Sequence, residues 1–119
     1  MTPNFDDSNW TSGNGGFGYG DNADQTIIDS TTSVYLRKQF QVIDTSNIAY
    51  AVLHADYDDA FIAYLNGVEI ARSNIGVVGD FQPFDASPTY FHEATLYREG
   101  RPEYFEINKN VLNLSLIHI

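Results

Sequence analysis

The chain carries several side chains suited to stacking on a sugar ring. Tryptophan and tyrosine offer a flat apolar face and a polar tip, and the candidates are Trp10, Tyr19, Tyr57 and Tyr64. In a small β domain such residues more often belong to the core, so both interpretations stay open for each of them. Trp10 and Tyr19 lie in a stretch rich in Gly and Asn and are the better ligand candidates.

Polar side chains of the right chemistry accompany the aromatic ones. Arg37 and Arg72 are two of only 6 basic residues, and a guanidinium forks onto sugar hydroxyls or onto a carboxylate. The alternative for each is an ion pair with one of the 16 acidic residues. Asn74 adds an amide donor and acceptor. The candidate ligand-binding residues are therefore Trp10, Tyr19, Arg37, Arg72 and Asn74.

Two acidic clusters have the oxygen ligands that calcium prefers. Asp21 and Asp24 follow a Gly-rich loop and are the candidate metal ligands, for a structural calcium. Their spacing differs from an EF-hand loop, which needs a Gly at its sixth position and a bidentate Glu at its end. The second cluster lies at residues 56–59, where Asp side chains capping their own backbone in a turn are the favoured alternative to calcium.

Catalytic patterns find little support in the sequence. It contains no Gly-x-Ser-x-Gly elbow and no phosphate-binding loop of P-loop form, which are the local signatures of two large enzyme classes. His54 and His92 lie far apart, and the chain has no cysteine, so thiol catalysis and thiolate zinc sites are excluded. We expect a protein that is not an enzyme; a pair of carboxylates at a catalytic separation would indicate an enzyme fragment.

A β-hairpin at residues 56–74 must position several of these groups. Asn66 and Gly67 separate two apolar-rich runs, and Asn-Gly is the strongest short signal for a type I′ turn, because both central residues need positive φ. A regular hairpin then fixes the register. The expected pairs are Leu65 with Val68, Tyr64 with Glu69, Ala63 with Ile70, Ile62 with Ala71, and Phe61 with Arg72.

Further strands are expected at residues 34–42, 48–57, 90–97 and 103–107, with a long connection at residues 73–88. Alternating aromatic and β-branched residues support the strands, and no segment has the pattern of an amphipathic helix. Many short strands separated by turn signals predict an all-β fold, as a β-sandwich or jelly roll.

Charge and length limit the classes of partner. The chain has 119 residues and a net charge of −10, which argues against nucleic acid and against an anionic membrane surface, since both require clustered Lys and Arg. No apolar run approaches the ~20 residues of a membrane span. No signal peptide is visible at the start of the sequence.

Five segments together resemble the galactose-binding-domain-like β-sandwich modules of large secreted bacterial proteins, which often carry lamin-tail or CotH-kinase-like domains. They are residues 16–26, 33–42, 56–74, 92–94 and 105–113. The resemblance implies a jelly-roll sandwich acting as a non-catalytic accessory module that binds carbohydrate weakly. It also implies an extracellular or cell-surface location, with neighbouring domains of the same polypeptide as partners. A structural or protein-interaction spacer without a sugar ligand is the alternative.

The end of the sequence departs from this family. Residues 114–119 read LSLIHI, which matches a translated sequencing adapter, where the family has a Gly-Asn turn and a further apolar strand. We expect residues 1–113 to form a single, incomplete sandwich domain and residues 114–119 to be a non-native tail.

Overall fold

A computed structural model describes residues 6–20, 24–40, 46, 48–96, 99–112 and 117–118. Its regular structure is β; the described residues contain no α-helix, and the 3-10 turn η2 is their one helical element described in full. The elements are β1 (Phe17–Gly18), β2 (Thr26–Ile27), β3 (Gln39–Phe40), β4 (Ala51–Ala55), β5 (Phe61–Leu65), β6 (Val68–Ser73), β7 (Glu103–Ile107), η2 (Lys109–Leu112) and β8 (Ile117–His118). The all-β class is confirmed. No helix in the described part of the chain has the length and apolarity of a membrane span.

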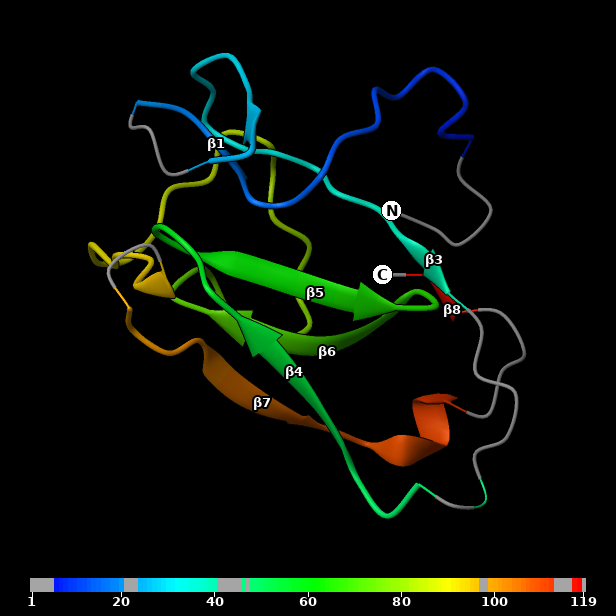
Figure 1. The fold of residues 1–119 in the computed structure, drawn as a ribbon. Helices are drawn as coiled ribbons and strands as arrows, with labels where there is room; N and C mark the ends of the chain where they lie inside the picture. Colours follow the sequence, from blue (N-terminus) through cyan, green and yellow to red (C-terminus); the bar gives the residue numbers. More distant parts are fainter. Residues whose placement is uncertain are drawn as a thin grey trace.

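The strands form four two-stranded sheets. β4 pairs with β7 and β5 with β6, both antiparallel, while short ladders join β1 to β2 in parallel and β3 to β8 in antiparallel fashion. The two longer sheets lie together at the centre of the molecule (Figure 1). Phe61 links them, because its ring centroid is 4.7 Å from that of Tyr57 and 5.1 Å from that of Phe105, the latter edge-on. Two sheets packed through aromatic rings are thus the framework of the fold.

The predicted hairpin is present, with its turn as expected. Asn66 has φ of 51° and Gly67 of 81°, the left-handed values that a type I′ turn requires. The first two predicted pairs are confirmed, Leu65 with Val68 and Tyr64 with Glu69.

Beyond these pairs the predicted register is wrong. The ladder shifts between Ala63 and Tyr64, so that Ala63 pairs with Ala71, Ile62 with Arg72 and Phe61 with Ser73. The structural reason is a β-bulge, in which Ile70 is an extra residue on β6 with no partner on β5.

This bulge decides which side chains share a face. Successive pairs along a hairpin alternate between its two faces. In the observed register the pairs of Glu69 and Arg72 are two steps apart and lie on one face, whereas a regular hairpin would put them on opposite faces. Phe61 and Ser73 then lie on the other face, toward the β4–β7 sheet. The bulge therefore creates a charged face, where Glu69 and Arg72 lie together, and moves Ser73 onto the face that carries Phe61.

Among the other predicted strands, two are confirmed and two are largely wrong. β4 and β7 lie within the predicted ranges 48–57 and 103–107. Among the described residues of the range 34–42 only β3 is a strand, since residues 34–38 belong to no described sheet; residues 41 and 42 lie outside the described residues. Residues 90–96 form no strand, because side chains rather than a neighbouring strand take up several of their backbone groups, and residue 97 lies outside the described part.

The core is small. Leu65 and Leu112 are 1% and 7% exposed and are packed by a shell of partly buried aliphatic residues, which includes Ile70 and Ile107. Many large apolar side chains of the described residues remain exposed, up to 96% for Phe91. Surface of this kind is where binding should be sought.

Candidate functional site

An open depression of about 430 Å³ lies where the end of β6 meets the start of β7. We call residues 89–93, which border it, the aromatic loop. The lining residues are Tyr57, Ser73, Asn74, Tyr90, Phe91, His92 and Glu103. The depression thus combines two exposed aromatic rings and the buried Tyr57 ring with hydroxyl, amide, imidazole and carboxylate groups, a mixture typical of small-molecule sites.

Tyr57 connects the polar groups at the base of the depression. Its phenol oxygen lies 2.8 Å from Ser73 Oγ and donates to Glu103 Oε2 at 3.0 Å. Burial, with Glu103 adding to it, raises the pKa of Tyr57 from its ordinary value. The phenol therefore stays protonated at neutral pH and acts as a hydrogen-bond donor to the carboxylate.

His92 lies between two hydrogen-bond acceptors. Its Nε2 is 2.7 Å from Glu103 Oε1 and its Nδ1 is 3.0 Å from the backbone oxygen of Tyr57. A carboxylate and a carbonyl only accept, so both contacts are hydrogen bonds only when both ring nitrogens carry a proton. The ring also stacks on Tyr57, with centroids 4.1 Å apart. The hydrogen bond to Glu103 is the main cause that raises the pKa of His92.

Asn74 and Asp59 hold the aromatic loop through its backbone. Asn74, with φ of 64°, accepts from Tyr90 N at 2.9 Å through Oδ1, while its Nδ2 donates to Tyr90 O and Asp59 O. Asp59 Oδ1 accepts from His92 N at 2.9 Å. These contacts fix the loop without using the side chains of Tyr90 and Phe91.

Asp56 extends the same anchoring to the next residues. Its two oxygens accept from Thr95 N at 2.7 Å and Leu96 N at 2.9 Å. Asp56 and Asp59 are therefore backbone-capping residues, but they cap a segment more than thirty positions away. The sequence predicted that these side chains cap their own turn. They cap the distant loop instead, because the loop passes beside the end of β4.

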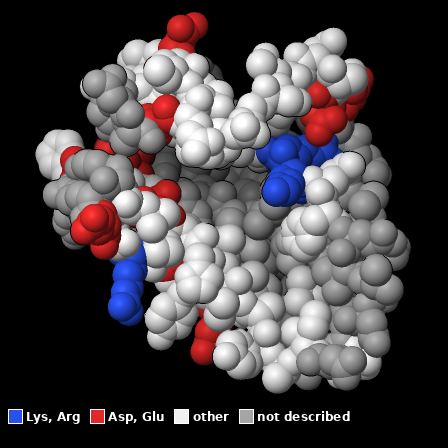
Figure 2. Space-filling model, in the orientation of Figure 1, with Lys and Arg blue, Asp and Glu red and all other residues white. Residues whose placement is uncertain are grey.

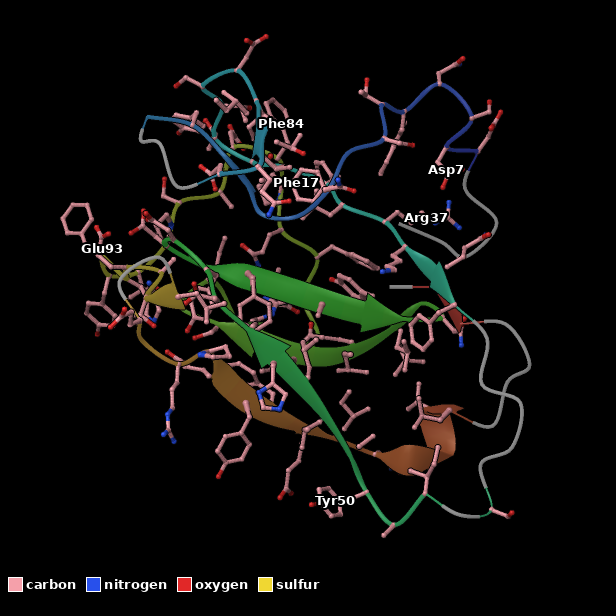
Figure 3. All side chains as sticks on the ribbon, in the orientation of Figure 1. Asp7, Phe17, Arg37, Tyr50, Phe84 and Glu93 are labelled. Atoms are coloured by element: carbon pink, nitrogen blue, oxygen red, sulfur yellow. The ribbon has the colours of Figure 1, made fainter. Side chains whose placement is uncertain are left out.

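Only one of the five predicted ligand residues lines the depression. That residue is Asn74. The Tyr19 hydroxyl donates to Thr31 O at 3.1 Å, and Trp10 is half-buried, with its backbone N–H donating to Asp7 O. Arg37 forms an ion pair with Asp7 at 3.3 Å. Figure 3 shows this pair at the end of the molecule opposite to Glu93, which marks the aromatic loop.

Arg72 has contacts of a different kind. It forms an ion pair with Glu69 at 2.7 Å, and the side chains are only 2% and 12% exposed. It also donates to the backbone oxygens of Ile75 and Asp80. The sequence left an ion pair open as the alternative for both arginines, and both form one. At Arg72 the ion pair also fixes the start of the 73–88 connection. Tyr64, on the same face, stacks on Phe81.

The predicted calcium ligands do not form a described site. Asp21 lies outside the described residues, and the Asp24 carboxylate lies against β1, where a Cβ added at Gly18 would collide with it. Within the described ranges no three His, Cys, Asp or Glu side chains gather to hold a metal ion. Calcium binding at Asp21 and Asp24 stays a prediction.

Sequence reasoning missed most of the depression. His92 and Glu103 are 11 positions apart, and Tyr57 and Glu103 are 46 apart, so no local spacing unites them. The available signals were the segment 92–94, which contributes to the family resemblance, and an acidic residue at the start of a strand. Acidic side chains gather on the side of the molecule that carries this loop (Figure 2).

Comparisons of the chain with protein-family models, with curated proteins and with solved structures find no match.

Proposed function

We propose that the chain is a non-catalytic carbohydrate-binding module and that the depression is its glycan site. The observation that carries this proposal is the pair of solvent-facing rings, Tyr90 and Phe91, 75% and 96% exposed, beside the Glu103 carboxylate. A ring face suits the apolar C–H face of a sugar. Glu103 and Ser73 have lone pairs left for sugar hydroxyls after their described hydrogen bonds.

Preorganisation of the rings supports binding. Because Asn74 holds Tyr90 by both its N–H and its C=O, a ligand would not have to order the backbone at that point, which is one of the usual costs of association. The depression is nevertheless shallow and leaves much of any ligand in solvent. Weak affinity follows from that shape.

The polar groups support binding rather than catalysis. The described lining of the depression contains a single carboxylate, Glu103, whereas the usual glycosidase mechanism uses two. The neighbour of Ser73 Oγ is the Tyr57 phenol, and a phenol with a raised pKa is a poor base for activating a hydroxyl. A reversible binding role suits this arrangement better.

The proposal includes a jelly-roll sandwich within a secreted or cell-surface protein, with neighbouring domains of the same polypeptide as partners. Support comes from the resemblance of the five sequence segments and from the packing of the β5–β6 sheet on the β4–β7 sheet through Phe61.

A structural or protein-interaction spacer is the second candidate, and one observation favours it. The connection after β6 exposes four large apolar side chains, between 67% and 78% of their surface, and these are Val77, Val78, Phe81 and Phe84. Apolar groups gathered in one exposed connection suit packing against a neighbouring domain.

A glycan array separates the two candidates. We expect the protein to retain neutral glycans, and Tyr90→Ala and Phe91→Ala each to weaken retention by about 3- to 10-fold, from the loss of one ring contact. Tyr50→Ala is the matched control, because Tyr50 is 76% exposed but lies away from the aromatic loop (Figure 3). A blank array for the unaltered protein, or an equal loss in the control, contradicts the proposal and favours the spacer.

A further inference from the structure

We infer that His92 is a proton-operated latch for the aromatic loop: as an imidazolium it holds the loop against the base of the depression, and as a neutral ring it releases it. The inference rests on the proposed function only in taking the depression for a glycan site. It concerns regulation of that site.

The latch follows from the number of protons on the ring. A neutral imidazole carries one N–H, so it can donate either to Glu103 or to the backbone oxygen of Tyr57, but not to both. At the observed distances of 2.7 and 3.0 Å the remaining nitrogen would then direct its lone pair at an acceptor. Loss of one proton thus leaves one of the two hydrogen bonds and turns the other contact into an unfavourable approach of two acceptors.

The groups that face His92 come from each element packed against it. Glu103 approaches from β7, and Tyr57, at the exit of β4, presents both its carbonyl and the face of its ring. Asp56 and Asp59 follow β4 and lie on the same side. Carboxylates, a carbonyl and a ring face all favour a cation over a neutral imidazole. The raised pKa of His92 agrees with this geometry, with Glu103 as its leading cause and burial opposing it.

The position of His92 explains why the release would be local. The base of the loop is held by Asn74, which accepts from Thr89 N through its backbone and from Tyr90 N through its side chain. An amide does not titrate, so this anchor acts at every pH. The His92 side chain is 30% exposed, so that protons reach it from solvent. Deprotonation would therefore weaken the hold on His92, which then keeps its N–H bond to Asp59 and at most one ring hydrogen bond, while the base stays in place.

Amide hydrogen exchange of the full chain from pH 5 to pH 9 tests the latch directly. We expect the protection factor of His92, whose N–H donates to Asp59, to fall about fivefold as the His92 ring, followed by its ¹⁵N shifts, loses its proton; a hydrogen bond to a partly exposed charged group supports a change of this order. His92→Gln should make the protection independent of pH. His54→Gln, which alters an exposed His on β4, should leave the pH profile unchanged.

The same three proteins, titrated with cellotriose, N-acetylchitotriose and galactobiose at pH 5.5 and pH 8.5, connect the latch to binding. We expect weaker sugar binding at the higher pH in the unaltered protein and in His54→Gln only. Protection that does not change with pH, or that changes equally in His92→Gln, overturns the latch even if a sugar binds. A pH-dependent loop that binds no sugar supports the latch and overturns the proposed glycan site.

Discussion

The ion pair between Arg72 and Glu69 is the best place to test the packing of the hairpin. The pair lies on the charged face that the β-bulge creates, with side chains 2% and 12% exposed. Replacing Arg72 by Met keeps much of the apolar volume and removes the charge. Within the described part of the chain, Glu69 then retains only a weak partner, the Gly79 N–H at 3.3 Å.

The expected cost follows from the uncompensated charge. Removing one member of a buried pair typically destabilises a protein by about 3–5 kcal/mol. Glu69 keeps some contact with water, so we expect about 3 kcal/mol for Arg72→Met. Glu69→Leu should cost about 2 kcal/mol, because Arg72 keeps the backbone oxygens of Ile75 and Asp80 as acceptors. The double variant, which leaves no unpaired charge, should also cost about 2 kcal/mol.

Urea unfolding followed by far-UV circular dichroism measures these free energies, and the double-mutant cycle isolates the pair. The two single costs should exceed that of the double variant by about 3 kcal/mol. Arg101→Met is the control, since Arg101 is exposed, and it should stay within about 0.5 kcal/mol. Additive single effects, or a cost below about 1 kcal/mol for Arg72→Met, would refute the account of a buried, bulge-dependent pair.

Three further predictions concern the hairpin and the latch. Leu65→Ala should lower the free energy of unfolding by about 2–5 kcal/mol because Leu65 is 1% exposed, while Val68→Ala, at a position 52% exposed, should change it far less in the same urea assay. Gly67→Ala should cost about 1 kcal/mol, because φ is 81° there; thermal melts that show no loss would contradict the turn assignment. The raised pKa of His92 predicts that its proton stabilises the folded state: the contribution is complete at a pH below the ordinary pKa of about 6.5 and is lost as pH rises through the raised pKa. Urea titrations at several pH values should show this loss in the unaltered protein and not in His92→Gln.

How much of the fold was predictable depends on how local its causes are. The Asn66–Gly67 turn and strand β7 were predictable, because turn chemistry and alternation are written in adjacent residues. The bulge was not, since Ile70 fits an apolar strand whether or not it is paired. The strand predicted at residues 90–97 failed because the side chains of Asp59 and Asn74 take up backbone groups for which the sequence pattern implied a neighbouring strand.

The candidate site was less predictable than the fold. Arg72 and Arg37 matched the chemistry of sugar recognition by type alone, and their partners, Glu69 and Asp7, depend on contacts that composition does not reveal. Conversely, the segment 92–94 contributed to the family resemblance but did not indicate which groups His92 contacts. Its role rests on acceptors from two separate strand ends, which only the folded chain brings together.

The anchoring of the aromatic loop through its main chain also bears on how its surface can change. Asp59 and Asn74 bind N–H and C=O groups of Tyr90 and His92, which every residue except proline supplies. Positions 90 and 91 can therefore exchange one side chain for another while the path of the backbone is retained. The loop is accordingly a natural place to randomise these two positions in a library, to obtain proteins that share one scaffold and recognise different molecules.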